Sequence, residues 1–328
     1  MVSLARIATV CQAGFASPSV DENRLHMMGL LNLALRQKPD LVCLPETFNS
    51  AGVPRSTIAQ VAESLPGPTT DAAAQRARQG GCYVICPLVT RRDGQCWNSA
   101  VVIDRQGAIL GVYDKLHPVT SSCDYTTFEE GTQPGSAAPV FDLDFGRVGI
   151  QICFDIQFPA GWASLAEQGA RMVFWPSAYN GGFPLQTYAW RHHYYVVSAV
   201  HTNTARIIDP CGAVLAETDA LMNLVTREIN LDYAVCHYDF NYNIPERILN
   251  RYPGQAAVRT YPDEGHFLVE VLDDSLTIAR LKQELGFLSV DEYTRYHQSA
   301  LDRLRAGQLP IPQQAAHGDR PMYTKNIP

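Results

Sequence analysis

The chain has 328 residues, of which 46% are hydrophobic and 18% are charged, and its formal net charge is -7. This balance is typical of a soluble enzyme with a sizeable core, and it argues against a disordered or fibrous protein. The acidic charge gives no reason to expect nucleic acid or an anionic membrane as a partner. No apolar run reaches the length of a membrane span, so we expect a cytoplasmic protein.

The cysteines point to the same compartment. There are nine of them, an odd number scattered over the chain, whereas a secreted disulfide scaffold has an even, closely spaced set. We therefore expect a reducing environment. Cys82 and Cys86 lie in an apolar run without a second pair at metal-ligand spacing, which favours two core thiols.

Strand-like and helix-like segments alternate along the first two thirds of the chain, which predicts an α/β architecture. Strands are expected over residues 4–11, 41–44, 83–89, 98–103, 108–113, 140–143, 148–152, 172–175, 195–200, 205–208, 214–216, 224–229 and 266–271. Helices are expected over residues 21–37, 70–78, 159–168, 184–193, 276–285 and 290–304. Because no linker or repeat is evident, we expect one domain over residues 1–306 and an irregular tail over 307–328.

The first expected helix is amphipathic. Leu25, Met28, Leu31 and Leu35 fall at spacings of three and four residues, which is the spacing of one helix face. We expect these four side chains to form its apolar face.

Three apolar strands each end near a chemically suited side chain. Glu46 offers a carboxylate just beyond the strand at 41–44, Lys115 an amine, and Cys153 a thiol. Functional groups are commonly placed beyond the ends of buried strands in α/β proteins. Each residue taken alone has an ordinary structural explanation, but their joint occurrence and order favour a catalytic centre.

Glu46, Lys115 and Cys153, with their flanking segments, resemble the carbon-nitrogen hydrolase (nitrilase) superfamily. The matching segments are residues 97–104 (WNSAVVID), 113–117 (YDKLH), 153–159 (CFDIQFP), 169–171 (GAR) and 175–178 (WPSA). The resemblance covers about residues 4 to 230 and implies a four-layer αββα sandwich. It also implies a Glu-Lys-Cys triad, no metal or organic cofactor, and at least a homodimer.

The chemistry of the three side chains fits that resemblance. A thiol is a poor nucleophile until it is ionised, so Glu46 would deprotonate Cys153 and later a water molecule. Lys115 and the backbone N–H of Phe154 would bind the oxyanion. Ammonia or an amine would leave, and water would release the acid from a thioester on Cys153.

Many members of the superfamily carry a second glutamate between the lysine and the cysteine. Counting back from Gly131 and Phe128 leads to Asp124, which is one methylene shorter than glutamate. We prefer Asp124 for this role. Glu129 or Glu130 would take it after a shift of the loop, and the sequence also allows that no residue fills it.

The segment after the strand at 172–175 supplies candidate substrate contacts. Tyr179 and Asn180 lie beside two glycines and are typical of an exposed loop, so we expect them, with Phe154, to bind substrate. For Trp175 and Trp190 we expect plain core packing.

Two histidine motifs have simpler structural explanations than catalysis. We expect His117 to be a turn histidine that hydrogen-bonds locally, because nothing directs it at Cys153. His192 and His193 are adjacent and point apart, so ring stacking or dimer contacts are favoured over a metal site.

The expected function is hydrolysis of a non-peptide C–N bond in a small amide or N-carbamoyl compound. A nitrilase is the nearest alternative, since the same triad attacks a nitrile carbon. A non-catalytic binding or scaffold protein is the alternative from another class, and only the departure at Asp124 supports it. No residue selects a particular substrate.

Overall fold

The computed structural model describes residues 4–202, 204–239, 241–273 and 275–312. Contacts divide these residues into two compact units. Ala5–Ile229 forms the first unit, and Leu4 with the described residues from Asn230 onward forms the second.

Two six-stranded sheets form the centre of the first unit. One sheet has the order β12-β1-β2-β3-β4-β5, and the other has the order β11-β10-β9-β8-β7-β6. The first contains β1 (Leu4–Val10), β2 (Leu41–Cys43), β3 (Tyr83–Arg92), β4 (Gln95–Ile103), β5 (Ile109–Asp114) and β12 (Leu224–Asn230). The second contains β6 (Val140–Leu143), β7 (Gly146–Ile150), β8 (Met172–Ser177), β9 (Tyr195–Val200), β10 (Arg206–Ile208) and β11 (Val214–Glu217).

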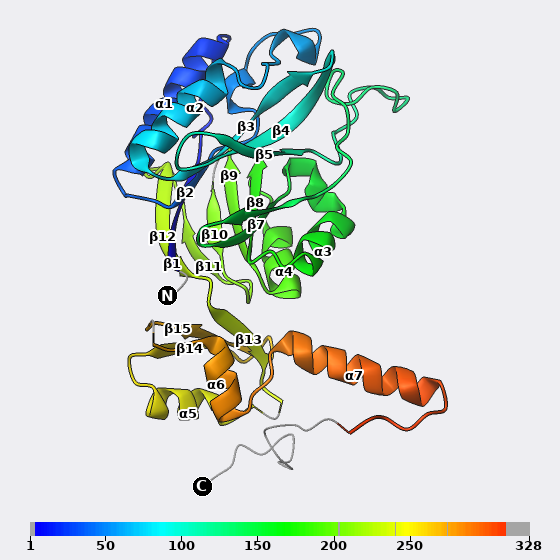
Figure 1. The fold of residues 1–328 in the computed structure, drawn as a ribbon. Coiled ribbons are helices and arrows are strands. Elements are labelled where there is room, and N and C mark those ends of the chain that lie inside the picture. The colour runs from blue at the N-terminus through cyan, green and yellow to red at the C-terminus, as the bar shows by residue number, and fades with distance from the viewer. Residues whose placement is uncertain (1–3, 203, 240, 274, 313–328) are drawn as a thin grey trace. The chain divides into compact units, whose positions relative to one another are not determined.

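Helices cover the outer face of each sheet (Figure 1). On the first sheet these are α1 (Val20–Leu35) and α2 (Pro68–Gly80), and on the second they are α3 (Pro159–Glu167) and α4 (Phe183–His192). The layers are therefore helices, sheet, sheet and helices, which confirms the expected αββα sandwich. Each sheet buries its apolar faces on both sides, as layered α/β folds require.

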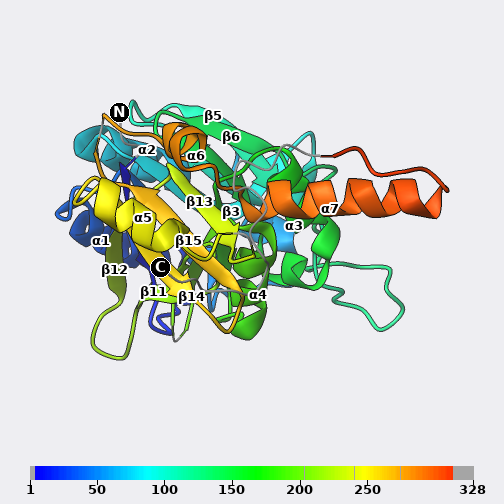
Figure 2. The ribbon, with the colours of Figure 1, turned by 90° about the horizontal axis from the view of Figure 1, so that it is seen from below.

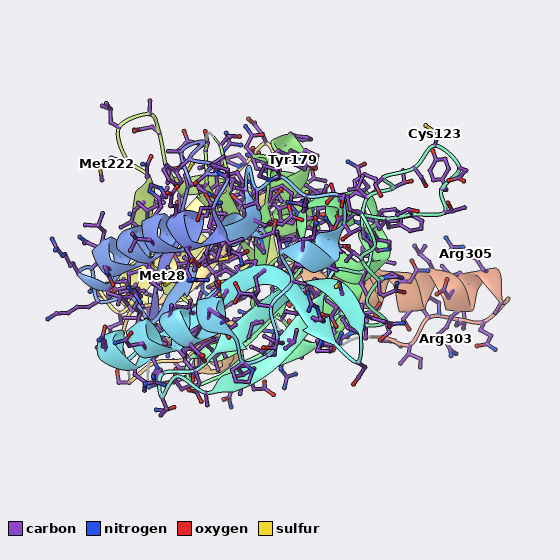
Figure 3. The ribbon with its side chains drawn as sticks, turned by 90° about the horizontal axis from the view of Figure 1, so that it is seen from above. Met28, Cys123, Tyr179, Met222, Arg303 and Arg305 are labelled. Atoms are coloured by element: carbon purple, nitrogen blue, oxygen red, sulfur yellow. The ribbon has the colours of Figure 1, made fainter. Side chains whose placement is uncertain are left out.

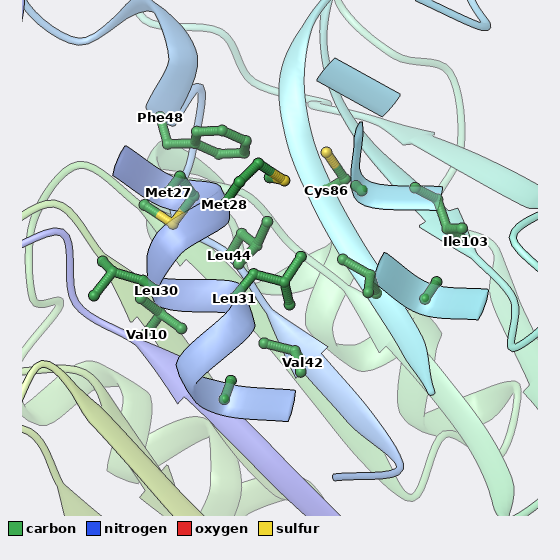
Figure 4. Close-up of a cluster of buried hydrophobic side chains, with 14 of the residues drawn as sticks. Val10, Met27, Met28, Leu30, Leu31, Val42, Leu44, Phe48, Cys86 and Ile103 are labelled. Carbon is green, nitrogen blue, oxygen red and sulfur yellow. The ribbon is translucent and has the colours of Figure 1, made fainter. Parts of the chain in front are cut away.

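The core beneath α1 and α2 shows how the sequence forms these layers. Met28 and Leu31 from α1 meet Val42 of β2 and Cys86 of β3 in one buried cluster (Figure 4). Cys82 is also fully buried there, so both Cys82 and Cys86 are core thiols, as expected. Burial of such side chains supplies most of the stabilisation of the layer.

One residue of the expected apolar face of α1 was assigned wrongly. The side chain of Leu25 is 73% exposed. The rotation of the helix is fixed by buried Asn23, whose amide donates to the carbonyl oxygens of Ser17, Asn49 and Ala51 at 3.0, 3.3 and 2.8 Å. A buried amide requires such partners, and satisfying them turns Leu25 to the solvent.

The strand directions bring the three candidate side chains to one end of the sandwich. β7, β8 and β9 run parallel to one another, so their C-terminal ends lie at the same edge. β1, β2 and β3 are likewise parallel. β5 is antiparallel to β4, and the N–H of Lys115 just after β5 donates to the carbonyl oxygen of Asn98 on β4 at 2.8 Å.

The second unit has its own sheet and core. β13 (Tyr233–His237), β15 (His266–Val271) and β14 (Ala256–Tyr261) form an antiparallel sheet in that order. α5 (Ile244–Arg251) and α6 (Ile278–Leu285) pack on it (Figure 2). α7 (Val290–Arg305) begins with the Ser289 and Glu292 capping box. Residues 313–328 of the expected tail lie outside the described residues.

β13, β14 and α5 were not expected from the sequence. The burial of β13 and β14 does not alternate along the strand, so neither shows the period of two residues that marks a half-buried strand. α5 has 8 residues, fewer than the window over which helical periodicity is read. Within the described part of the chain, every helix lacks the length or the apolar character needed to cross a bilayer.

Candidate active site

The structure brings the three predicted side chains together in the buried edge of the first unit. Glu46 lies three residues beyond β2, Lys115 directly follows β5, and Cys153 opens a 3-10 turn, Cys153–Gln157, just beyond β7. Their exposed fractions are 5%, 1% and 8%. Three separate chain segments therefore place ionisable groups where water is largely excluded.

Lys115 connects two carboxylates. Its Nζ lies 2.8 Å from Oε1 of Glu46 and 2.5 Å from Oε1 of Glu129. The side-chain amide of Asn98 donates to the same two groups, at 2.8 Å to Oε1 of Glu46 and 3.0 Å to Oε2 of Glu129. The two acids are therefore held apart by two donors, which reduces the repulsion between like charges.

These contacts fix the protonation states. Burial opposes charge on Glu46, but the adjacent Lys115 ammonium and the hydrogen bonds from Lys115 and Asn98 lower its pKa below the ordinary value. Burial likewise opposes charge on Lys115, yet the carboxylates of Glu46 and Glu129 raise its pKa. At neutral pH Glu46 is thus ionised and Lys115 is protonated.

The thiol of Cys153 is neutral in the free site. Burial and the Glu46 carboxylate raise its pKa to about 12, although the Lys115 ammonium and hydrogen bonds from Ser177 and Ala178 act in the opposite direction. The backbone of Cys153 has φ of 45°, a left-handed conformation that side chains other than glycine rarely adopt. Such strained positions cluster at functional sites.

Glu46 forms hydrogen bonds through both its side chain and its backbone. The N–H of Ala178, just beyond β8, donates to Oε2 of Glu46 at 2.9 Å. The ring Nε2 of His201 hydrogen-bonds to the backbone carbonyl of Glu46. One oxygen of Glu46 therefore faces Lys115 and Asn98, and the other faces the segment that also contacts Cys153.

Asp155 fixes the turn that begins at Cys153. Its Oδ2 accepts hydrogen bonds from the Tyr113 hydroxyl at 2.7 Å and the Ile152 N–H at 2.8 Å. Its Oδ1 pairs with the backbone N–H and ring Nδ1 of His117 at 2.9 and 2.8 Å. Since Asp155 is fully buried, it ties the segment around Lys115 to the turn after Cys153.

Asp124 does not reach Lys115, so its assignment as the second carboxylate was wrong. Its carboxylate accepts hydrogen bonds from the backbone and hydroxyl of Thr126 on an exposed loop. Glu129 occupies the position beside Lys115 instead. Glu130 forms an ion pair with Arg55 at 2.5 Å. Counting residues fails here because the loop has no regular period, and Cys123, next to Asp124, lies at its projecting end (Figure 3).

Tyr179 and Asn180, two of the expected substrate contacts, follow β8. Tyr179 is 41% exposed and packs edge-on against Trp175, and burial and the nearby charge of Cys153 raise its pKa. Asn180 follows it and is half-buried. Figure 3 shows Tyr179 on the face seen from above.

Phe154 borders a cavity of about 520 Å³. Three of its walls come from residues that each adjoin a site residue in sequence: Leu116 next to Lys115, Phe128 next to Glu129, and Phe154 next to Cys153. The complete lining is Leu116, His117, Pro118, Val119, Thr120, Tyr125, Phe128, Pro134, Phe154 and Phe158. The cavity is mostly apolar and aromatic.

His117 was expected to hydrogen-bond locally, but its ring bonds to Asp155, 38 residues further along the chain, and stacks on Phe158 with ring centroids 3.7 Å apart. The ring of His192 stacks with that of Tyr194 at 5.4 Å. In the described ranges, no group of three or more His, Cys, Asp or Glu side chains has metal-binding geometry. Trp190 was expected in the core but is 38% exposed.

Sequence reasoning missed two residues of the site. Asn98 and Asp155 lie inside recognised segments, but no role was assigned to them. The available signal was a polar side chain within an otherwise apolar strand for Asn98, and a carboxylate two residues after the nucleophile for Asp155. Buried polar side chains need partners, so both were candidates for site contacts.

Comparisons with known proteins identify the family. A sequence model of the carbon-nitrogen hydrolase family matches residues 7–235. Omega-amidase NIT2-A of Xenopus laevis is 27% identical over 241 residues, covering 66% of this chain and 86% of that protein. Deaminated glutathione amidase of Synechocystis is 30% identical over 241 residues, covering 66% and 88%. For omega-amidase NIT2 of Bos taurus the identity is 32% over 165 residues, covering 48% and 59%.

Solved structures share the fold. An amidase from Nesterenkonia sp. matches with a TM-score of 0.61 and 21% identity, covering 70% of this chain and 91% of that one. Nit3 of Saccharomyces cerevisiae, a member of the nitrilase superfamily, matches with a TM-score of 0.61 and 19% identity, covering 76% and 94%.

Since the family match extends over more than half of its 328 residues, the chain belongs to the carbon-nitrogen hydrolase family. It is accordingly a hydrolase of carbon–nitrogen bonds other than peptide bonds. The match ends at residue 235, so the expected extent of one domain, 1–306, remains a prediction for the residues beyond it.

The contacts of Asp155 predict the effect of an isosteric change. Asp155→Asn replaces one acceptor oxygen with an amide that faces existing donors, so buried hydrogen bonds are lost. We expect the free energy of unfolding to fall by about 2–4 kcal/mol, measured by urea denaturation. Asp124→Asn, on the exposed loop, is the control and should leave the midpoint unchanged. An unchanged midpoint for Asp155→Asn would show that the turn does not depend on this carboxylate.

Proposed function

We propose that the protein is an amidase in which Cys153 attacks the carbonyl carbon of a small primary amide, with Glu46 as base and Lys115 as oxyanion donor. The observation that carries this proposal is the buried contact of Lys115 with Glu46 and Glu129 beside the thiol. A cation, two acids and a nucleophile in one water-poor site match the needs of acyl transfer through a thioester.

The first step couples proton transfer to attack. Because the pKa of Cys153 is raised and that of Glu46 is lowered, moving the proton in the free site is unfavourable. The proton therefore passes from Sγ to Glu46 as the bond from sulfur to the carbonyl carbon forms. The carbonyl oxygen takes the negative charge that the thiolate would have carried.

The oxyanion meets two donors. The Lys115 ammonium supplies a full positive charge, and the N–H of Phe154 follows the nucleophile on the turn. A single preorganised donor of this kind typically contributes about 3–4 kcal/mol to the barrier reduction. Collapse of the tetrahedral intermediate breaks the C–N bond, Glu46 returns its proton to the nitrogen, and ammonia leaves a thioester on Cys153.

Water completes the cycle with the same groups. Glu46, again ionised, takes a proton from a water molecule that attacks the thioester carbon. Lys115 and Phe154 bind the second oxyanion, sulfur leaves as a thiol with the proton from Glu46, and the carboxylic acid is released. In each half of the cycle Glu46 accepts a proton and then returns it, and Lys115 binds the oxyanion both times.

Glu129 fills the second-carboxylate role in this scheme. It stands 2.5 Å from Nζ of Lys115 and shares the amide of Asn98 with Glu46. Its backbone N–H and one side-chain oxygen both bond to Val119, at 2.8 and 3.1 Å, so the loop holds the charge in place. Glu129 keeps Lys115 protonated and offers an acceptor for the N–H groups of the leaving nitrogen.

The substrate class rests on the relatives. Their names describe amidases, acting as omega-amidases and on deaminated glutathione, which supports a primary amide over a nitrile or an N-carbamoyl compound. Phe154 directly follows Cys153, and Tyr179 and Asn180 follow β8; these three residues would contact the acyl group. The apolar cavity beside Phe154 suits an uncharged part of it.

We also propose a homodimer in the cytoplasm. The aromatic cavity extends to Phe158 at the start of α3, which follows the nucleophile, and the superfamily resemblance places pairing about this helix. No disulfide joins cysteines in the part of the chain that the structure describes, which fits a reducing compartment. The mass in solution, measured by light scattering, distinguishes a dimer from a monomer.

The proposal predicts ammonia release from primary amides. Of a panel of omega-amides, apolar amides, N-carbamoyl amines and nitriles, the amides should give the highest kcat/KM. Cys153→Ala should have no turnover, and Glu46→Gln and Lys115→Met should each lower kcat by about a hundredfold or more. Preferred turnover of a nitrile would replace the amidase by a nitrilase. Wild-type kcat in Cys153→Ala would refute the mechanism.

A separate prediction concerns the second carboxylate. Glu129→Gln keeps the shape of the side chain and removes its charge, so kcat should fall by about tenfold to a hundredfold with a smaller change in KM. Asp124→Asn and Glu130→Gln are matched controls that remove a carboxylate from the same loop, and steady-state kinetics should give near wild-type values for both. Equal kcat in all three variants would exclude Glu129 from this role.

A further inference from the structure

Trp175 makes a polar contact that core packing does not require. The residue lies on β8 and is fully buried. Its indole Nε1–H donates to the backbone carbonyl oxygen of Cys153 at 3.0 Å. A buried indole N–H needs an acceptor, and here the acceptor belongs to the nucleophile itself.

We propose that Trp175 is a positioning residue for the oxyanion site, because it holds the peptide unit whose other end is the N–H of Phe154. This inference rests on the proposed function, since it assigns a role within the same reaction. Trp175 touches neither substrate nor the reacting atoms, and it acts through the peptide between Cys153 and Phe154.

The planarity of the peptide bond transmits the effect. In a trans peptide the C=O and the N–H point in opposite directions, so fixing the Cys153 oxygen fixes the direction of the Phe154 N–H. That N–H lies in the first turn of the 3-10 helix Cys153–Gln157, where N–H groups have no intrahelical acceptor. It is thus available to a substrate oxygen. Donation to the carbonyl also polarises the peptide and strengthens the N–H as a donor.

The backbone at Cys153 makes this restraint necessary. Its φ of 45° is sparsely populated for residues with a side chain and persists only when surrounding contacts impose it. On one side of the turn, Asp155 binds the Ile152 N–H at 2.8 Å. On the other side, Trp175 binds the Cys153 oxygen, so both flanks of the nucleophile are fixed.

The indole itself has no room to move. Gly181 has φ of +67°, and a Cβ added there would lie 2.7 Å from Cη2 of Trp175 and 2.9 Å from Cδ1 of Leu185. The ring of Tyr179 packs edge-on against the indole, with centroids 5.3 Å apart. The loop after β8 therefore closes over the ring.

The same strand end also orients the base. Three residues beyond Trp175, the N–H of Ala178 donates to Oε2 of Glu46 at 2.9 Å. The end of β8 thus sets the position of Glu46 relative to Cys153, and it does so through backbone and indole donors that carry no titratable proton.

Trp162 provides a matched control. It is fully buried, and its Nε1–H donates to the carbonyl oxygen of Asp155 at 3.1 Å in the same turn. Its ring stacks on Tyr188 with centroids 4.2 Å apart. The peptide that it binds joins Asp155 to Ile156, and the N–H of that peptide is not the oxyanion donor.

The experiment removes the indole N–H at each position in the full chain. Trp175→Phe and Trp162→Phe are compared with variants in which β-(3-benzothienyl)alanine replaces the same tryptophan, since this ring keeps the shape and lacks the N–H. Two quantities are measured: kcat and KM for the best amide, and the inhibition constant of the aldehyde with the same acyl group. The thiol adds across the aldehyde carbonyl, so this adduct carries an oxygen in the oxyanion position.

At Trp175 we expect both changes to lower kcat by about tenfold to a hundredfold, with KM changed by less than about threefold. The aldehyde inhibition constant should rise by a factor similar to the fall in kcat. At Trp162 the benzothienyl variant should keep kcat and aldehyde inhibition within about threefold of wild type.

Wild-type kcat and aldehyde affinity in the Trp175 benzothienyl variant would overturn the inference, and so would equal losses at the two positions. Either result would leave the proposed function standing, because that function is decided by ammonia release in the wild type and its loss in Cys153→Ala.

Discussion

The ammonium of Lys115 lies between the carboxylates of Glu46 and Glu129 in a place that water scarcely reaches. An isolated buried charge is strongly unfavourable, so each of these three groups requires the others. They come from the segment after β2, the end of β5 and an irregular loop. The segments around the thiol must therefore fold to positions compatible with this contact, and Asn98 and Asp155 supply the hydrogen bonds that hold them there.

The charges of this cluster also limit how the reaction can proceed. Two carboxylates and one ammonium leave one net negative charge, and a free thiolate would add a second in the same water-poor volume. The raised pKa of Cys153 expresses that cost. In the proposed mechanism the thiol proton moves to Glu46, so the net charge of the site stays constant. The substrate oxygen beside Lys115 would then carry the negative charge in place of sulfur.

The parts of the site that the sequence predicted are those attached to regular elements. Glu46 and Cys153 follow strands that end in buried residues, and Lys115 follows β5, which is partly exposed. The parallel strands within each sheet bring their C-terminal ends to one edge. The alternation of strands and helices predicted an α/β architecture, because most of these elements are long enough to show a period. The four layers were implied by the resemblance to the carbon-nitrogen hydrolase superfamily.

The residues that could not be predicted from the sequence depend on the exact rotation of a helix or on the conformation of an irregular loop. Glu129 is at φ of 38° in a loop, and no periodicity fixes which of several acids in such a loop faces inward. The exposure of Leu25 depends on the partners of Asn23, which come from segments distant in sequence. The donation from Trp175 to Cys153 needs the three-dimensional position of both residues, because composition marks tryptophan only as a core side chain.

The loop between Lys115 and Glu129 has a fixed base, which holds the Glu129 carboxylate, and a projecting tip, which does not contact that carboxylate. Its base is closed where Glu129 bonds to Val119, and its tip, which carries Cys123 and Asp124, projects away (Figure 3). The hydrogen bonds between Glu129 and Val119 hold the Glu129 carboxylate in place whatever the length of the tip. Insertions and deletions can therefore accumulate between these points during evolution without moving the charge, and numerical spacing from the lysine is a poor guide to equivalent acids in distant homologues. In such a family, the equivalent acid is better identified by its hydrogen bonds to the base of the loop than by the number of residues that separate it from the lysine.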